Sequence, residues 1–175
     1  IDVDNAKVIR LKIPADAHRG TLSDDISSSG TYDDNRWSDD ATKLAFISTS
    51  RDHKVEKVRI ADAATGDVKE IFEEKVATQY ESGQGAINFH FLQASNEIIW
   101  YSERDDWGHL YIYDATTGKQ KNQVTKGDFV VTRLLKIDEK NRTLYFEANG
   151  REKGRDPYFS HFYRINFDGS KLQLL

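Results

Sequence analysis

The sequence contains no cysteine, so disulfide bonds and thiolate metal sites are excluded, and the redox state of its compartment cannot be inferred. It also contains no methionine. We therefore expect a processed segment or a piece of a longer protein rather than a complete gene product.

Long apolar stretches are missing as well. No run approaches the ~18 residues that a membrane-spanning helix requires, and Ile1–Asp4 has neither a basic start nor an apolar signal core. The formal net charge is −4, and the lysines and arginines are dispersed, so no basic field is available to bind phosphates. We expect neither a membrane span nor a nucleic-acid partner.

What is present is an internal repeat of about fifty residues. One turn signature occurs at Asp62–Gly66, again at Asp114–Gly118, and in shortened form at Asp168-Gly169. The glycines are 52 and 51 residues apart, and a short alternating apolar segment stands on either side of each turn. This pattern predicts a β-hairpin in every repeat.

A second pair of strands is expected upstream of each hairpin, where an apolar triplet follows a polar turn. The triplets are Leu44-Ala45-Phe46, Ile98-Ile99-Trp100 and Leu144-Tyr145-Phe146. Four antiparallel strands per repeat of this length are typical of a propeller blade, whose sheet buries both faces only when neighbours stack on it. The predicted fold is all-β, a partial β-propeller of four-stranded antiparallel blades. A β-sandwich is disfavoured because its strands have no reason to repeat one turn chemistry.

The repeat predicts one propeller segment with five parts. These are the last strands of a preceding blade at 1–14, a polar loop and linker at 15–36, and blades at 37–85, 86–127 and 128–175. Within the first blade, Glu73–Ala77 is predicted to form a helical turn.

Two motifs carry a family resemblance. Trp37–Phe46 resembles the Trp-Ser-x-Asp-x-x-x-Leu-Ala-Phe blade opening of peptidase propellers. Ser102–Tyr111 resembles the Ser-Glu-Arg-Asp-Gly-Trp-x-His-Leu-Tyr stretch of the dipeptidyl peptidase IV N-terminal domain, with Asp106 in place of the family's glycine. The structural motif residues are Trp37, Ser102, Glu103, Arg104, Asp105, Trp107 and His109.

The resemblance implies a parent enzyme of the prolyl oligopeptidase clan of serine peptidases. In that clan a propeller limits peptide access to an α/β-hydrolase domain. It also implies a periplasmic or extracellular location. A nucleophile elbow, Gly-x-Ser-x-Gly, does not occur in this sequence. The chain is therefore expected to be non-catalytic, with the hydrolase domain of the same parent chain and a peptide substrate as partners.

Candidate functional residues fall into two groups. Arg51 and Arg104 recur after the second strand of a repeat, where they could contact a peptide carboxylate or form an ion pair between blades. A long charged hairpin tip with aromatics is the candidate interface to the hydrolase domain or to a second subunit in a homodimer. Its residues are Arg151, Lys153, Arg155, Tyr158 and Phe159.

No cofactor is expected, and no metal site. The five histidines show no close ligand spacing, and His109 is expected to fasten one strand to another by a hydrogen bond. The histidines are His18, His53, His90, His109 and His161. The aspartate pairs at 24–25, 33–34 and 39–40 lack a calcium-loop pattern, so a solvated acidic surface is the favoured interpretation.

Two other functions stay open at this point. One is a propeller-like binding or scaffold module of the kind that resembles TolB, without a peptidase domain. The other is an enzyme that uses two carboxylates, such as a glycosidase, although the acids are spread over the whole repeat. Because three blades cannot close a ring, the isolated chain is expected to be an oligomer or only marginally stable.

Overall fold

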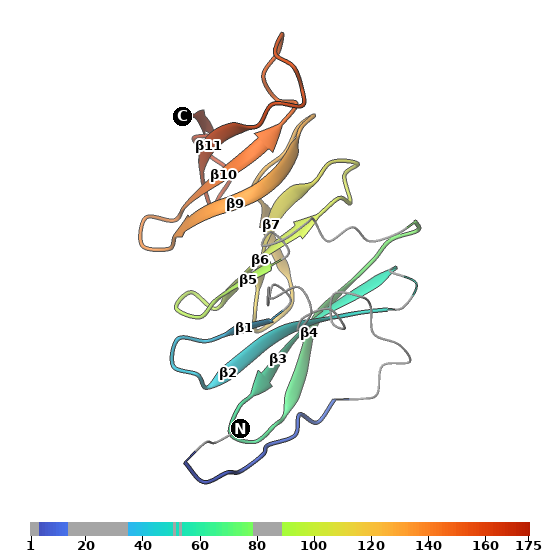
Figure 1. Ribbon diagram of the computed structural model, residues 1–175, viewed down its shortest axis with the longest axis vertical. Helices are drawn as coiled ribbons and strands as arrows, with labels where there is room; N and C mark the ends of the chain where they lie inside the picture. Colours follow the sequence, from blue (N-terminus) through green and yellow to red (C-terminus); the bar gives the residue numbers. More distant parts are fainter. Residues whose placement is uncertain (1–3, 14–34, 51, 53, 79–88) are drawn as a thin grey trace. The chain divides into compact units, whose positions relative to one another are not determined.

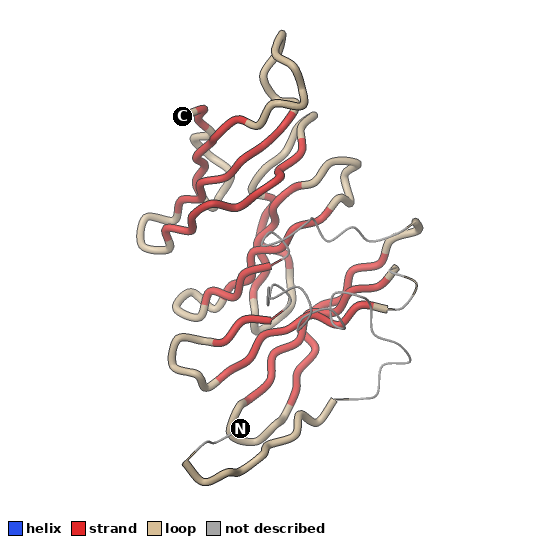
Figure 2. Tube along the Cα trace, in the orientation of Figure 1, coloured by secondary structure: helices blue, strands red, loops and turns tan. Residues whose placement is uncertain are grey.

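The computed structural model describes residues 4–13, 35–50, 52, 54–78 and 89–175. Every regular element in these ranges is a β-strand (Figures 1 and 2). The strands form three four-stranded antiparallel sheets, each from consecutive strands. The predicted all-β fold, a partial propeller of four-stranded blades, is confirmed, while the blade boundaries stay predictions.

The first sheet comprises β1 (Asn35–Trp37), β2 (Lys43–Thr49), β3 (Val55–Asp62) and β4 (Val68–Lys75). The predicted helical turn at Glu73–Ala77 is wrong, because residues 73–75 continue β4. They pair with β3 in register, and Lys57 on β3 forms ion pairs with Glu73 and Glu70 on β4. Cross-strand pairing thus overrides the helical propensity of the Glu-Glu-Lys stretch.

Residues 4–13 lie beside the turn between β3 and β4. Lys12 forms a single parallel bridge with Asp67, donates its backbone N–H to the carbonyl of Gly66 at 2.7 Å, and places Nζ 2.8 Å from the Asp67 carboxylate. No strand forms within 4–13, and the assignment of this segment to a preceding blade stays a prediction.

The second sheet comprises β5 (Phe89–Leu92), β6 (Glu97–Ser102), β7 (His109–Asp114) and β8 (Gln120–Gln123). All six residues of β6 are buried, so neither face of its side chains meets solvent. A strand buried on both sides is the pattern expected of a sheet whose two faces are both covered.

The third sheet comprises β9 (Val130–Asp138), β10 (Thr143–Asn149), β11 (His161–Asn166) and β12 (Gln173–Leu174). From Leu144 on, β10 alternates between buried and half-buried residues. Its fully buried side chains, such as Phe146, stand on the same face as Tyr163 of β11, and the two rings stack 5.4 Å apart.

The repeated turns are built by one local device. Asp62 accepts backbone N–H bonds from Ala64 and Thr65, at 2.9 and 2.8 Å, and Asp114 accepts the equivalent bonds in the second sheet. These bonds lower the pKa of both carboxyl groups. The turn then closes through Gly66, whose φ of +75° is a backbone conformation that glycine adopts without strain.

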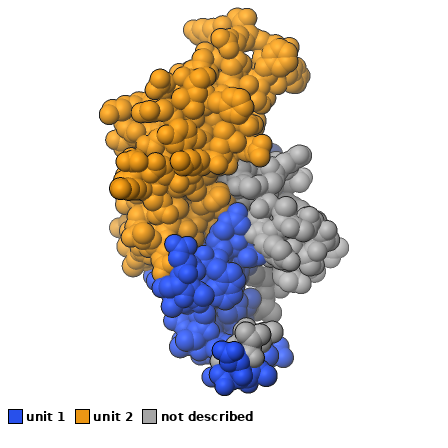
Figure 3. Space-filling view, turned by 60° about the vertical axis from the view of Figure 1, so that its left-hand side comes forward, with its two compact units in different colours: residues 1–80 blue, residues 81–175 orange. Residues whose placement is uncertain are grey.

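The chain divides into two compact units, Ile1–Tyr80 and Glu81–Leu175 (Figure 3). In the second unit the second and third sheets share one apolar core. It includes Ile99, Tyr101, Leu110 and Ile112 from the second sheet and Leu134, Leu144, Phe146, Tyr163 and Ile165 from the third. The shared core fixes these two sheets against each other.

Candidate functional site

The motif Ser102–His109 contains the loop between β6 and β7, residues 103–108, and His109, the first residue of β7, anchors it. The His109 ring lies 3.1 Å from the Thr125 hydroxyl through Nδ1 and 3.0 Å from the Gly127 carbonyl through Nε2. It also meets the Phe129 ring edge-on at 5.1 Å. Burial lowers the pKa of His109, against an opposing effect of the Gly127 carbonyl. A neutral imidazole thus ties β7 to the connection between β8 and β9.

Arg104 lies in the same loop with its guanidinium held on several sides. Nε donates to the Ser102 hydroxyl at 2.9 Å, and Nη1 donates to the Gln120 side-chain carbonyl at 3.1 Å. The guanidinium lies over the Tyr111 ring, 4.4 Å from its centroid, a favourable cation–π geometry. Arg104 is therefore an exposed cation with a fixed orientation.

A second polar group stands beside Arg104. The Tyr111 hydroxyl donates to the Asp105 carboxylate at 2.7 Å, and the Gln123 amide donates to the same oxygen at 2.9 Å. Glu103 accepts a longer bond, 3.4 Å, from the Tyr101 hydroxyl. These bonds connect the loop to β7 and β8.

The remaining motif residues differ in exposure. Ser102 is fully buried, whereas Trp107 is 40% and Trp37 55% exposed. Arg51, the other candidate for a peptide contact, lies outside the described residues, as do His18, His53 and the loop at 79–88. Trp37 and Arg104 belong to different compact units, and each is described within its own unit.

The candidate interface residues all stand in the connection between β10 and β11, which projects beyond the third sheet (Figure 1). Tyr158 is 88% exposed and Phe159 66% exposed. Arg151 instead lies over the Tyr163 ring and pairs with Glu152 at 2.8 Å.

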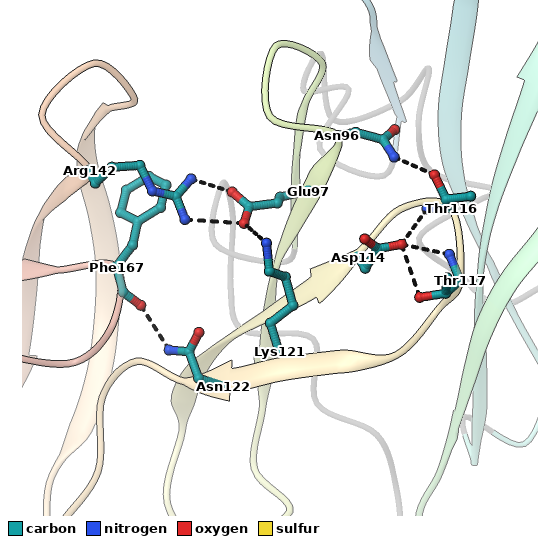
Figure 4. A network of polar contacts seen from close by, with 9 residues as sticks. All are labelled: Asn96, Glu97, Asp114, Thr116, Thr117, Lys121, Asn122, Arg142 and Phe167. Atoms are coloured by element: carbon teal, nitrogen blue, oxygen red, sulfur yellow. Dashed lines mark hydrogen bonds and ion pairs between the residues drawn. The ribbon is translucent and has the colours of Figure 1, made fainter.

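Sequence reasoning missed an ionic network around the buried Glu97, between the second and third sheets (Figure 4). Glu97, whose side chain is 2% exposed, accepts hydrogen bonds from Arg142 in the β9–β10 turn and from Lys121 on β8. Burial alone would raise the pKa of Glu97, but the bonds from Arg142, Lys121 and Ser95 outweigh it and lower the pKa to about 2. In the sequence, the one sign of this network was an acidic residue, Glu97, at the start of an apolar strand.

Two further contacts reinforce this junction. The Arg142 guanidinium lies over the Phe167 ring at 4.2 Å, and the Asn122 amide donates to the Phe167 carbonyl at 2.8 Å (Figure 4). We call Glu97, Lys121, Asn122, Arg142 and Phe167 the inter-sheet clamp. It is a rigid support between two sheets.

Within the part of the chain that the structure describes, no group of three or more histidine, aspartate or glutamate side chains is placed to hold a metal ion. None of the described segments forms an apolar helix of membrane-spanning length.

Stacked four-stranded antiparallel sheets with repeated turn chemistry define the class of β-propeller proteins. The family model for the "Dipeptidyl peptidase IV (DPP IV) N-terminal region" matches residues 4–175. The chain belongs to this family, and the predicted resemblance is confirmed.

Individual relatives agree with the family assignment. Dipeptidyl peptidase 4 of Arthroderma otae is 33% identical over 67 residues, which are 38% of this chain and 8% of that protein. Dipeptidyl peptidase 4 of Trichophyton rubrum is 31% identical over 70 residues, with the same coverage. The match therefore spans a small part of each relative.

Among solved structures, the chain is similar to dipeptidyl peptidase 4 of Porphyromonas gingivalis. The two share a TM-score of 0.71 and 21% identity, over 96% of this chain and 21% of that chain. At this identity the similarity establishes the fold alone.

Proposed function

We propose that this chain is a non-catalytic β-propeller segment of a secreted dipeptidyl-peptidase-like serine exopeptidase. In this proposal it gates peptide access to an α/β-hydrolase domain that lies elsewhere in the same longer protein, here called the parent protein. The family match over residues 4–175 carries the proposal.

In this proposal the hydrolase domain catalyses peptide cleavage, and this segment controls access to it. Acyl transfer needs a serine on a sharp strand-to-helix turn, and the sequence has no Gly-x-Ser-x-Gly to form one. The hydrolase domain would supply the nucleophile, whereas this segment would supply a rigid wall. Because gating depends on a channel of fixed width, the inter-sheet clamp and the shared apolar core support the role by holding two sheets in one arrangement.

Arg104 is the described candidate for a peptide contact. Its fixed guanidinium suits a carboxylate, because an oriented arginine loses little freedom when it binds. Its bonds to Ser102 and Gln120 and its stacking on Tyr111 equally suit a structural role. Arg104→Lys distinguishes the two: a peptide contact raises KM for peptides with little change in thermal stability, and a structural role lowers stability.

The experiment that tests the proposal uses the full-length parent protein. We expect it to release dipeptides from an Xaa-Pro amide and from a long unfolded polypeptide with the same N-terminus, but not from a folded protein with that N-terminus. Secretion is checked by fractionating cells of the source organism, with activity expected in the periplasm or medium. A parent protein that releases no dipeptide would favour the TolB-like binding module instead.

A further inference from the structure

Strand β9 is an edge strand of the third sheet, and it departs from a regular strand at two points (Figure 1). Its register with β10 shifts twice, and Thr132 and Leu135 are the extra residues of these two β-bulges. A bulge sets two consecutive residues opposite one and turns their side chains in a new direction. Bulges are over-represented next to active sites, and β9 has two of them.

The bulges change which side chains of β9 reach solvent. Val131 and Leu134 are buried in the core shared with the second sheet. A regular strand turns every second residue to the opposite face, whereas β9 exposes two residues in succession after each of these buried ones. We call the four exposed residues the β9 face: Thr132, Arg133, Leu135 and Lys136.

The β9 face is cationic. Residues 130–137 contain two basic residues, Arg133 and Lys136, and no acidic one. Arg133 lies 3.7 Å from the Glu147 carboxylate, but the Arg133 side chain is 68% exposed. An ion pair this long and this exposed is weak, because water screens it. The Arg133 guanidinium therefore remains accessible to an acidic ligand.

The Lys136 ammonium is also accessible. It lies over the Tyr145 ring, 5.7 Å from the centroid, a contact that orients the charge without neutralising it. The acid that follows in the strand, Asp138, accepts hydrogen bonds from the backbone N–H and the side-chain amide of Asn141, at 3.0 and 2.9 Å. These bonds hold the Asp138 carboxylate in the β9–β10 turn.

The place of β9 in its sheet indicates what the β9 face meets. In a β-propeller the blades surround a central channel, and the first strand of each four-stranded sheet runs nearest to it. β9 is the first strand of the third sheet, and among the described strands it pairs with β10 alone. In the ring that we propose for the parent protein, the β9 face therefore borders the channel.

The same features disfavour a peptide that would add to β9 as a further strand. Bulges and charged side chains on an edge strand are the means by which proteins prevent such pairing. A peptide in the channel would thus meet β9 through side chains. Contacts of this kind attract a peptide without retaining it.

We propose that the β9 face selects among long peptides by charge and favours those with acidic side chains beyond the dipeptide that is released. This inference rests on the proposed function, because it assigns a substrate class to the channel. Charge complementarity carries it: cations on a channel wall of low dielectric constant raise the local concentration of anionic ligands and their rate of encounter by about 10-fold or more. Arg133 and Lys136 are the specificity-determining residues.

Peptide cleavage by the full-length parent protein tests this proposal. Two peptides share an N-terminal Xaa-Pro dipeptide, and one continues in a glutamate-rich tail, the other in a glutamine-rich tail. For the wild type at low ionic strength we expect a kcat/KM about 10-fold higher with the glutamate tail, mainly through KM, and a ratio that approaches one at high ionic strength. Arg133→Gln with Lys136→Gln should bring the ratio close to one. Arg133→Lys with Lys136→Arg keeps both charges and should retain the ratio.

Lys119→Gln with Lys140→Gln is the matched control, because it removes two exposed lysines from turns outside β9 and should leave the ratio unchanged. Urea unfolding reports whether each variant folds. A wild-type ratio near one, a ratio that survives Arg133→Gln with Lys136→Gln, or equal loss in the control would overturn the proposal. So would a loss of stability in Arg133→Gln with Lys136→Gln at an unchanged ratio, the result expected if a neighbouring sheet of the parent protein covers the β9 face.

Fluorescence anisotropy of the two labelled peptides measures binding without catalysis. Tighter binding of the glutamate tail that is lost in Arg133→Gln with Lys136→Gln, without any dipeptide release, would contradict the proposed function alone. Dipeptide release with no preference for either tail would contradict this inference alone.

Discussion

Replacing Glu97 by glutamine should remove a large part of the stability at the junction of the second and third sheets. The Glu97 pKa falls from 4.5 to about 2 in the folded chain, which corresponds to about 3 kcal/mol at neutral pH. Because the Lys121 and Arg142 side chains are 46% and 44% exposed, solvent screens part of this energy. We expect Glu97→Gln to destabilise the fold by about 2 kcal/mol at pH 7.

The stability that Glu97 contributes should decrease as the pH falls. The folded-state pKa lies below the unfolded one, so the contribution of Glu97 is complete above about pH 4.5 and is lost as the pH falls toward about 2. The difference between wild type and Glu97→Gln should therefore shrink steadily over this window.

Urea unfolding followed by tryptophan fluorescence at pH 7 and at steps down to pH 3 measures both effects. Hydrogen exchange of β6 and β10 amides in the parent protein provides a second, local measure of the same junction. Glu139→Gln, an exposed glutamate in the β9–β10 turn, is the control and should change little. Equal urea midpoints for wild type and Glu97→Gln at pH 7 would show that Glu97 does not stabilise this junction, as would the same loss of stability with falling pH in the variant and the wild type.

Two other predictions follow from the same unit. His109→Gln should lose about 1–3 kcal/mol of stability through the buried bond to Thr125. Since burial lowers the His109 pKa, the wild type should lose stability as the pH falls below about 6.5, and His109→Gln should lose less over the same range; pH-dependent melting temperatures check this. Gly169→Ala should cost more than about 1 kcal/mol, because its Cβ would lie 2.9 Å from the Val124 carbonyl oxygen at a φ of +83°. Gly154→Ala, at φ +78° with open space around the Cβ, should cost less in the same urea experiment; equal costs would contradict a steric cause.

The repeat could be predicted from the sequence because its turns are local. Asp62 and Asp114 accept hydrogen bonds from backbone N–H groups only two or three residues ahead. The residues that form each turn are therefore close together in the sequence, where a short motif reveals them. The strand pairs beside each turn follow from alternation and turn length.

The contacts between sheets could not be predicted in the same way. Glu97 and Arg142 are 45 residues apart, and nothing near either residue indicates its partner. The prediction of a helical turn that included Glu73–Lys75 was wrong for a related reason. The helical propensity of these residues is intrinsic to them, whereas the β3 residues with which they pair lie elsewhere in the sequence. The exposure of Tyr158 and the inward turn of Glu152 likewise depend on Asn149 and Tyr163, which only the folded hairpin brings near.

We propose above all that these three sheets are consecutive blades of a propeller placed over a hydrolase domain. The most direct measurement is an experimental structure of the full-length parent protein with a bound dipeptide product. We expect β1–β12 to form three successive blades of one ring, with the dipeptide in a hydrolase domain reached through the cavity they help to enclose. A parent protein without a hydrolase domain, or with the product bound where these sheets do not limit access, would contradict it.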